Sequence, residues 1–444
     1  MSDGDATGAR APSLWLDPPP QPRPALEGDV EADAVVVGAG YTGLWAALGL
    51  RQRAADVVVL ERDYAGFGAS GRNAGHLTPT IGKDLPTVLR LHGRERGGRL
   101  VRFAEAAVEH VEAAIAEHGI ECDYVAAGNV LAGIHPGQAP AMERAARAAA
   151  ELGAAVRVLD ADDLDERGLP RHVACGYLEE RGGVLDPGKY VRALGSLAQD
   201  AGVRLHESSP VEAIATGARV RVETPRGSVT APVCVLATNA YTPRLGMLRS
   251  AVAPLYVSLF ATDPLDAAQR ERVGWPGGEG IYTAHEVLES YRLTADGRIV
   301  GGSRQVRYPY GGRALPDRDD AVFAALAAMF RDRFPELAGL AIDRFWSGPI
   351  AMTMDFLPAV GRSGSLVYGV GYNGHGIAQA SYVGTMLARL ASGEDPGHPE
   401  IVSRRRLPYP PEPVRWALAQ ILLRSFAAID RRHDRRARPR GGGG

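Results

Sequence analysis

The stretch that decides the fold reads AVVVGAGYTGL at residues 34–44 and resumes as VVVLE at residues 57–61. The two apolar runs predict buried parallel strands, and the residues from Leu44 to about Arg53 between them predict a helix. Gly38 and Gly40 permit a tight turn where the backbone can approach a pyrophosphate, and Gly43 lets the helix pack on the strand. This order of elements predicts a dinucleotide-binding unit.

Two features of charge strengthen this prediction. The helix directs its N-terminal amides and the positive end of its dipole towards the phosphates. Glu61 follows the second strand, about 20 residues after the glycines, where its carboxylate can accept hydrogen bonds from ribose hydroxyls of adenosine. The alternative interpretation is a glycine-rich loop in an α/β fold that binds no nucleotide.

The segment GFGASGRNAGH at residues 66–76 distinguishes between the two common dinucleotides. A nicotinamide enzyme needs no small, flexible, polar run directly after the acidic residue. A flavin lying across the sheet does, because the chain must pass close to a flat ring system. Residues 68–75 resemble the flavin-contacting segment of the D-amino-acid-oxidase-like FAD-dependent oxidoreductases, and within them the gamma-glutamylputrescine oxidoreductase-like branch.

Three later segments resemble the same family: ATNAY at 237–241, DFLPAVG at 355–361 and GYNGHG at 371–376. The resemblance implies an α/β fold with an FAD-binding Rossmann-like domain of the glutathione-reductase or D-amino-acid-oxidase type. An interleaved α+β substrate domain built on an antiparallel sheet is expected beside it. We expect residues 28–86, 183–246 and 355–406 in the FAD-binding domain, and residues 87–182 and 247–354 in the substrate domain.

The two ends of the chain are expected to lie outside both domains. Residues 1–27 are interpreted as an extended, proline-rich lead-in, and residues 407–444 as a C-terminal helix and basic tail. Residues 430–440 are strongly basic and are interpreted as solvated, with a membrane surface or a partner as the alternative. The apolar face of the final helix is predicted from Val414, Leu418, Ile421, Leu422, Phe426 and Ile429.

Composition limits the classes of partner and compartment. The formal net charge of −2 over 444 residues gives no global field that attracts nucleic acid, and no nucleic-acid partner is expected. No run of about 18 apolar residues exists and no signal peptide is recognisable, so we predict a cytoplasmic protein without an integral membrane segment. Cys122, Cys175 and Cys234 show neither zinc-ligand spacing nor a disulfide framework, and no metal is expected.

The family resemblance implies which residues bind FAD. They lie on the glycine turn, after the second strand, in the flavin segment, near the strand exits and on the GYNGHG turn. The predicted FAD-binding residues are Gly38, Gly40, Tyr41, Thr42, Gly43, Glu61, Arg62, Gly68, Ala69, Ser70, Arg72, Asn73, Ala74, Gly75, His76, Val211, Ala237, Thr238, Asn239, Gly371, Asn373, Gly374, His375, Gly376 and Ile377.

The turn at residues 371–376 opens a helix, so its amides and dipole can stabilise negative charge near N1 and the C2 carbonyl of reduced flavin. The alternative for His375 is a helix cap without an electronic role. In some relatives the flavin is attached covalently to a histidine or cysteine. Asn73 occupies the position that we align with one such histidine, so we predict non-covalent FAD, with attachment through His76 as the alternative.

The second domain is expected to supply the catalytic and substrate-binding side chains. Arg292, within YRLTADGR at 291–298, is the candidate to hold a substrate carboxylate by a bidentate pair, a role that the resemblance implies. Its alternative is a surface salt bridge. Tyr256, Tyr282, His285 and Trp346 are further pocket candidates, and a core position is the alternative for each.

The resemblance implies oxidation of the C–N bond of an amine or amino acid to an imine, by hydride transfer to flavin N5, followed by imine hydrolysis. The substrate is expected to be a small molecule, oxidised as by gamma-glutamylputrescine oxidoreductase. A D-amino-acid or glycine oxidase or dehydrogenase is the first alternative. An FAD-binding module that acts on a tethered macromolecule, suggested by the basic tail, is the second.

The electron acceptor stays open between dioxygen and another molecule. Sarcosine-oxidase-like relatives use a lysine over the flavin to assist the reaction with dioxygen, and Lys83 and Lys189 are the only lysines in this chain. Neither lies at an obvious position over the ring. The sequence does not predict the oligomeric state.

Overall fold

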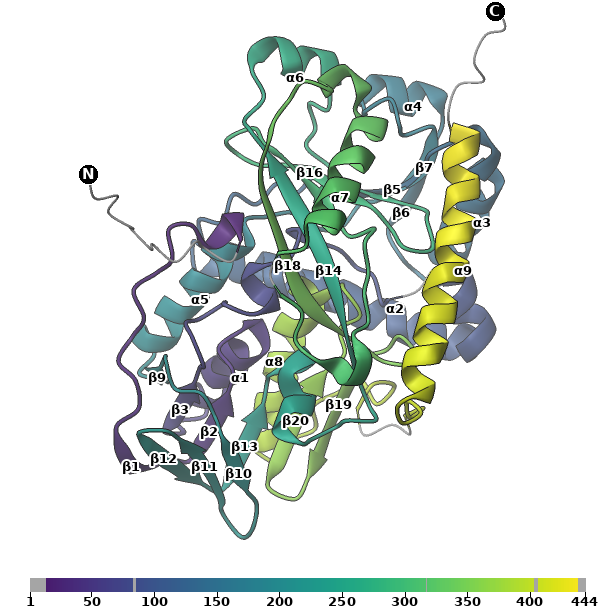
Figure 1. The fold of residues 1–444 in the computed structure, drawn as a ribbon. Coiled ribbons are helices and arrows are strands. Elements are labelled where there is room, and N and C mark those ends of the chain that lie inside the picture. Colours follow the sequence, from purple (N-terminus) through teal and green to yellow (C-terminus); the bar gives the residue numbers. More distant parts are fainter. Residues whose placement is uncertain (1–12, 83–84, 317, 403–405, 438–444) are drawn as a thin grey trace, which may run out of the picture.

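The computed structural model describes residues 13–82, 85–316, 318–402 and 406–437. Parts of the predicted lead-in and tail, and Lys83, lie outside these residues. The described chain forms a mixed α/β fold with two large sheets, one in the lower and one in the upper part of Figure 1. A smaller four-stranded sheet and a two-stranded pair complete the strands that the structure describes.

The glycine-rich stretch lies in a six-stranded sheet with the order β19-β20-β13-β2-β3-β9. The edge strand β19 runs antiparallel to β20, whereas the other neighbouring strands are parallel. The parallel order explains why the strands read as continuous apolar runs, because both faces of such a sheet are covered. The strands are β2 (Ala34–Val37), β3 (Val57–Leu60), β9 (Arg204–His206), β13 (Val233–Leu236), β19 (Ala359–Ser363) and β20 (Leu366–Val370).

The two faces of this sheet pack against different partners. Val36 and Val59 belong to a core with the helices α1 (Tyr41–Arg51), α5 (Pro187–Asp200) and α8 (Gly376–Ala391). Their neighbours Val35 and Val58 point to the other face and pack against the four-stranded sheet, because successive strand residues alternate in direction. That sheet contains β1 (Gly28–Glu31), β12 (Gly227–Ala231), β11 (Val220–Thr224) and β10 (Ala213–Ala215).

Gly38 and Gly43 make the tight turn and the close helix packing that their spacing predicts. Gly38 adopts a φ of +102°, which side chains disfavour. A Cβ on Gly43 would lie 1.8 Å from the carbonyl oxygen of Gly38, so only a glycine lets α1 start this close to β2. The turn is therefore tight because of both residues.

The second large sheet has eight strands in the order β18-β14-β17-β16-β15-β5-β7-β6. Neighbours are antiparallel except for the parallel pair of β5 and β15. Its strands all fall within residues 87–182 and 247–354, although the domain boundaries themselves stay a prediction. The strands are β5 (Asn129–Gly133), β6 (Val156–Leu159), β7 (Cys175–Glu179), β14 (Ala253–Thr262), β15 (Gly280–Thr283), β16 (Ser290–Leu293), β17 (Ile299–Gly302) and β18 (Ile342–Met352).

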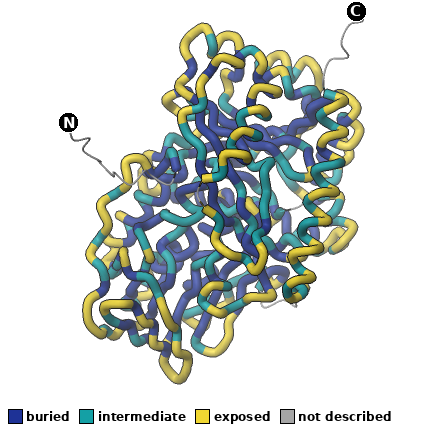
Figure 2. The backbone as a smooth tube through the Cα atoms, in the orientation of Figure 1, coloured by how far each residue is buried: buried dark blue, intermediate teal, exposed yellow. Residues whose placement is uncertain are grey.

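Several helices and one strand pair surround the two sheets. The pair β4–β8 brings the residues after the flavin segment against the chain that leads into α5. Figure 2 shows the buried backbone running through the interior of both parts, with exposed residues on loops and outer helix faces. These elements are α2 (Leu85–Glu117), α3 (Ala139–Glu151), α4 (Ala161–Glu166), α6 (Ala267–Val273), α7 (Asp320–Arg333), β4 (His76–Leu77) and β8 (Gly183–Val184).

In the part of residues 430–440 that the structure describes, the four arginines are exposed, as the interpretation of a solvated tail expects, whereas Asp430 and Asp434 face the body. The final helix α9 (Val414–Ala437) continues through these residues and lies along the edge of the molecule (Figure 1). Asp430 is fully buried, whereas the apolar residues Leu418 and Ile421 are exposed. The helix therefore contacts the body through its polar side, since Asp430 and Asp434 find arginine partners there.

Among the described residues, no helix has both the length and the apolar character that crossing a bilayer requires.

Candidate functional site

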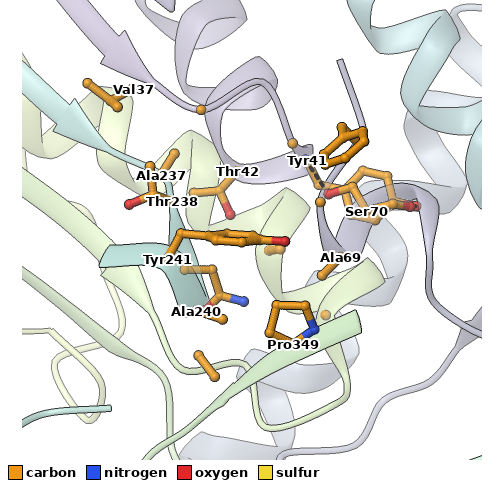
Figure 3. A pocket seen from close by; sticks show the side chains of 18 of the residues that line it. Val37, Tyr41, Thr42, Ala69, Ser70, Ala237, Thr238, Ala240, Tyr241 and Pro349 are labelled. Carbon is orange, nitrogen blue, oxygen red and sulfur yellow. Dashed lines mark hydrogen bonds between the residues drawn. The ribbon is translucent and has the colours of Figure 1, made fainter. Parts of the chain in front are cut away.

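A cavity of about 340 Å³ lies at the carboxyl ends of the parallel strands β2, β3 and β13. Its walls come from the first turns of α1 and α8, the flavin segment, the helical turn η4 (Asn239–Leu245) and strand β18. Figure 3 shows Tyr241 and Pro349 projecting into this space near Ala69 and Ser70. Ligands in open α/β sheets bind at this position, outside the carboxyl ends of the strands.

Two helices direct uncapped N-termini at this cavity. Gly40 precedes α1 and His375 precedes α8, and neither residue supplies a side-chain cap; of the first amides of α1, that of Tyr41 donates to Ser70. By contrast, α4, α5, α6 and α7 are each capped by an aspartate. The free amides and the positive dipole ends of α1 and α8 therefore remain available for a ligand with negative charge.

Glu61 is held in place at one end of the cavity. Its Oε2 accepts a hydrogen bond from the amide of Ala39 at 2.8 Å, and its Oε1 accepts one from the amide of Asp63 at 3.2 Å. Burial raises the pKa of this carboxyl, while the two amide bonds oppose the shift. The carboxylate oxygens keep further lone pairs for the hydroxyl groups of a ribose.

The flavin segment is braced by side chains that it carries itself. The side-chain Nδ2 of Asn73 donates to the carbonyl of Ser70 at 2.8 Å, and its Oδ1 accepts from the backbone amide of Gly75 at 2.9 Å. The Tyr41 hydroxyl donates to the same Ser70 carbonyl at 2.7 Å, and the Tyr41 amide donates to the Ser70 hydroxyl at 3.1 Å. These bonds fix the segment against the start of α1.

The opposite wall is fixed in the same way. Asn239 accepts a hydrogen bond from the amide of Gly371 at 2.9 Å, which ties the exit of β13 to the turn before α8. Asn373 donates to the carbonyl of Gly371 at 2.7 Å and accepts from the amide of Thr353 at 2.9 Å. The hydroxyls of Thr42 and Tyr372 lie 2.7 Å apart and join α1 to this turn.

Most of the predicted FAD-binding residues line the cavity. The others are neighbours of lining residues. Gly43 packs on Gly38, and Arg72 donates to the carbonyl of Phe67. The remaining five belong to the segment after Asn73 or to the turn before α8. Those that line it are Gly38, Gly40, Tyr41, Thr42, Glu61, Arg62, Gly68, Ala69, Ser70, Asn73, Val211, Ala237, Thr238, Asn239, Asn373, Gly374, Gly376 and Ile377. Those that do not are Gly43, Arg72, Ala74, Gly75, His76, Gly371 and His375.

Arg292 lies behind the flavin segment. Its Nη1 donates to the carbonyls of Leu185 and Gly75, and its guanidinium carbon lies 5.2 Å from the centre of the Trp15 ring. Burial lowers the pKa of Arg292 to about 10. The alternative of a surface salt bridge does not fit, because the side chain is 2% exposed.

Trp346 and Tyr256 also support the cavity from outside its lining. The indole of Trp346 donates to the carbonyl of Arg72 at 2.9 Å and packs edge-on against Trp15. The hydroxyl of Tyr256 accepts a hydrogen bond at 3.3 Å from Arg244, which does line the cavity. Both side chains are buried.

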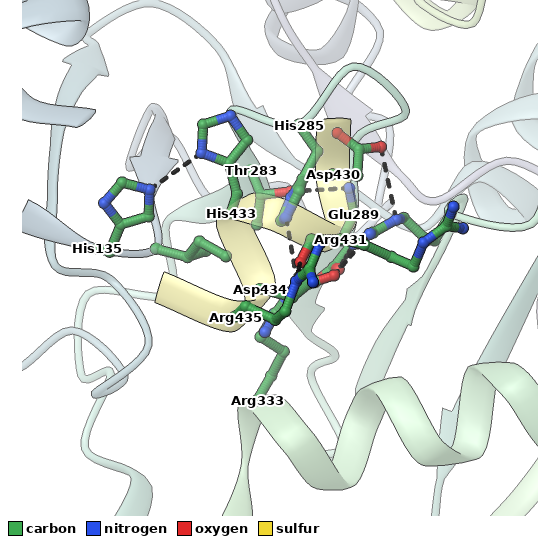
Figure 4. A network of polar contacts seen from close by, with 12 residues as sticks. His135, Thr283, His285, Glu289, Arg333, Asp430, Arg431, His433, Asp434 and Arg435 are labelled. Atoms are coloured by element: carbon green, nitrogen blue, oxygen red, sulfur yellow. Dashed lines mark hydrogen bonds and ion pairs between the residues drawn. The ribbon is translucent and has the colours of Figure 1, made fainter. Parts of the chain in front are cut away.

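His285 lies elsewhere, in a polar network beneath α9 (Figure 4). Its Nε2 is 3.4 Å from Asp434, and its Nδ1 is 2.6 Å from the hydroxyl of Thr283. His285, Glu289 and Asp434 could together surround a metal ion. Both carboxylates already pair with Arg304 and Arg333, so arginine charge fills the role of a cation here.

Several lining residues escaped prediction from the sequence. Tyr241 is the last residue of the ATNAY segment and Arg244 follows three residues later in the same helical turn, so that turn was the available signal. Tyr372 also lines the cavity and lies inside the GYNGHG turn, although it is not among the predicted residues. Pro349 and Ile350 carried no signal, because they belong to an ordinary strand and reach the cavity only through the position of β18.

The comparisons with known proteins agree with this geometry. The family described as DAO: FAD dependent oxidoreductase matches residues 33–390. The chain is 29% identical over 396 residues to gamma-glutamylputrescine oxidoreductase of Escherichia coli (strain K12), covering 88% of this chain and 90% of that protein. It is 26% identical to D-amino acid dehydrogenase of Methylobacterium sp. (strain 4-46), covering 84% and 98% respectively.

Solved structures share the fold. Glycine oxidase from Geobacillus kaustophilus superposes with a TM-score of 0.72 at 19% identity, over 85% of this chain and 99% of that chain. L-proline dehydrogenase from P. horikoshii gives 0.69 at 21% identity, over 84% and 98%. The predicted architecture is confirmed by these matches.

Proposed function

The chain belongs to the FAD-dependent oxidoreductase family, since the family match covers residues 33–390 of 444, and from that premise we propose its reaction. We propose that the protein oxidises the C–N bond of a small amine or amino acid to an imine, which water then hydrolyses. The observation that carries the proposal is one cavity with Glu61 at one end and the uncapped start of α8 at the other. The similarity to gamma-glutamylputrescine oxidoreductase favours an amine of that kind as substrate.

The residues of the cavity fit FAD. Glu61 would hold the ribose of the adenosine half, and the amides at the start of α1 would hold the pyrophosphate. The start of α8 would stabilise negative charge on the ring, and the braced segment at 68–75 would lie along it. Bound FAD supplies the acceptor for the hydride equivalent, while the protein orients the amine and excludes water.

We propose that FAD is bound without a covalent link. Asn73, at the aligned position of attachment, uses its amide to brace its own segment. His76 has its Nδ1 within 3.0 Å of Asn129. The cysteines Cys122, Cys175 and Cys234 are buried and do not line the cavity.

The acceptor and the cellular location complete the proposal. Lys189 pairs with Asp123 at 2.8 Å on the surface, so a lysine-assisted reaction with dioxygen has no support from this residue. We propose that dioxygen or another molecule accepts the electrons from the flavin, and that the protein acts in the cytoplasm. The relatives favour oxidation of a small molecule over the tethered-macromolecule alternative, because their names describe amine and amino-acid oxidoreductases. A D-amino-acid or glycine oxidase or dehydrogenase is the second candidate, because of the D-amino acid dehydrogenase match.

An anaerobic titration tests the proposal. The purified protein should be yellow, and acid precipitation should release all of the flavin into the supernatant. Adding a gamma-glutamyl or N-alkylated amine under anaerobic conditions should bleach the flavin band, whereas free D-amino acids and glycine should bleach it slowly or not at all. Faster bleaching by free amino acids would favour the second candidate. A protein that stays colourless after refolding with excess FAD would contradict the proposal altogether.

A further inference from the structure

Glu179 is the exception among the buried carboxylates of this protein. A buried carboxylate is costly unless a cation or several hydrogen bonds compensate its charge. The described chain has six buried carboxylates. Five of them have a basic side chain within 4 Å, and Glu179 has none among the described residues. The six buried carboxylates of the described chain belong to Glu179, Glu207, Glu279, Glu289, Glu400 and Asp430.

The contacts of Glu179 leave one of its oxygens almost free. The Tyr282 hydroxyl donates to Oε2. Thr80 reaches Oε1 only at 3.5 Å, the limit of a hydrogen bond. Burial, with a smaller contribution from the charge of Glu105, raises the pKa of this carboxyl to about 7 against the opposing effect of the Tyr282 hydrogen bond. A cation placed beside Oε1 would supply the missing compensation.

Two more acceptors without partners belong to residues that contact Thr80 and Tyr282, the same two residues that contact Glu179. The Nε2 of Gln379 donates to the carbonyl of Thr80 at 2.6 Å, which leaves Oε1 of this fully buried side chain without a partner. The ring of His76 lies edge-on to Tyr282, with centroids 6.4 Å apart, and its Nε2 is buried and unpartnered. Glu179, Gln379 and His76 therefore each present an unsatisfied or weakly bound polar atom.

His76 is a neutral imidazole with its proton on Nδ1, so its Nε2 is an acceptor. Asn129 donates through Nδ2 to the carbonyl of Leu77 at 2.9 Å, so its Oδ1 faces His76 and accepts from Nδ1 at 3.0 Å. Burial lowers the pKa of His76 to about 4, so the ring is neutral and Nε2 carries a lone pair. A Cβ on Gly280 would lie 2.5 Å from Nδ1 of His76, so tight packing holds this orientation.

None of the three side chains lines the cavity, but His76 and Gln379 are close along the chain to residues that do. His76 follows the flavin segment directly, and Gln379 lies on the first turn of α8, two residues after the lining residue Ile377. An ammonium group has three donors and no acceptor, which matches three acceptors and a carboxylate charge.

We propose that Glu179, Gln379 and His76 form a cation subsite that binds an ammonium group of the substrate. The inference rests on the proposed function and deepens it, because it selects protonated primary amines as the substrate class. A free carboxylate on the substrate is not required for binding at this subsite. Glu179 supplies the charge, and the two neutral acceptors orient the remaining N–H donors.

Binding of an amine that cannot be oxidised tests the subsite separately from the reaction. tert-Butylammonium carries no hydrogen on the carbon beside nitrogen, so it can bind without reducing the flavin. Titrating the FAD-loaded protein at pH 8 with tert-butylammonium chloride, we expect a saturable change in the flavin absorbance. Glu179→Gln should weaken this binding at least tenfold, whereas the matched control Glu105→Gln should change it less than twofold.

Thermal unfolding separates this role from a structural one. Removing an uncompensated buried charge should leave the melting temperature of Glu179→Gln equal to or above that of the unaltered protein. A lower melting temperature with unchanged tert-butylammonium binding would overturn the proposal in favour of a structural role. Absence of binding to the unaltered protein, or tighter binding of propionate that Glu179→Gln abolishes, would overturn it as well. If amines bind but none bleaches the flavin, the proposed reaction fails and the subsite stands.

Discussion

At the scale of single residues, the position of an acidic side chain decides what it can bind. Glu61 and Glu179 both lack a salt bridge among the described residues, and both have a raised pKa because of burial. Glu61 lines the cavity at the end of β3 and is held by two backbone amides. Glu207, by contrast, pairs with Arg23 at 2.9 Å and serves the fold. An acid that the protein itself does not neutralise indicates a ligand.

Replacing Glu61 should therefore weaken the binding of FAD and leave the fold intact. Glu61→Gln keeps one acceptor oxygen but loses the charge, and charge-assisted hydrogen bonds to ribose hydroxyls contribute about 1.5–3 kcal/mol. We expect the dissociation constant of FAD to rise about tenfold or more, measured by recovery of flavin fluorescence on dilution. The exposed Glu223→Gln is the control and should bind FAD normally. Equal affinity in the two variants would contradict the assignment of Glu61.

At the scale of elements, α9 shows that a helix can dock through its polar side. Its Asp430 accepts hydrogen bonds from the amides of Glu286 and Val287, at 2.8 and 3.2 Å. Asp434 pairs with Arg304 at 2.8 Å and with Arg333 at 2.6 Å. The apolar stripe that suggested a packed face instead lies largely on the exposed side. A pair of carboxylates thus sets the orientation of the whole helix.

Asp434→Asn should loosen α9, because the two arginines lose their counter-charge. We expect the free energy of unfolding at pH 7 to fall by about 3 kcal/mol, measured by urea denaturation. Burial acts to raise the pKa of Asp434, but hydrogen bonds from His285, Arg304 and Arg333 lower it well below its ordinary value. A carboxyl with a lowered pKa stabilises the fold at any pH above its ordinary pKa of about 4. This stabilisation is lost as the pH falls through the lowered pKa.

The difference between Asp434→Asn and the unaltered protein should therefore narrow in acid and be full at neutral pH. The exposed Asp165→Asn on α4 is the matched control and should change the stability little at either pH. A constant difference down to acid pH would show that the ion pairs are not its cause.

At the scale of the whole molecule, the cavity couples distant parts of the chain. Its walls include α1, the exit of β13, strand β18 and the start of α8, which come from both large sheets. A ligand that fills this space ties these parts together, so binding should stabilise the complete fold.

FAD should accordingly raise the melting temperature of the apoprotein more than FMN does. FAD at 100 times its dissociation constant adds about 2.7 kcal/mol to the free energy of unfolding. FMN lacks the adenosine half that Glu61 is placed to hold, so the same concentration should give a smaller shift. Differential scanning fluorimetry of the apoprotein measures both. An equal shift with FMN would mean that the Glu61 end of the cavity contributes nothing to binding.

The glycine turn, the buried strands, the acid after β3 and the small polar segment at 68–75 could all be predicted from the amino-acid sequence. These features depend on backbone conformation and side-chain direction over a few consecutive residues, which local chemistry fixes. Three features became visible only in the folded structure: Pro349 and Ile350 reach the cavity, α9 docks by Asp434, and Glu179 and His76 both contact Tyr282. The order and register of the strands bring these residues together across a hundred or more positions, and no local pattern encodes that pairing.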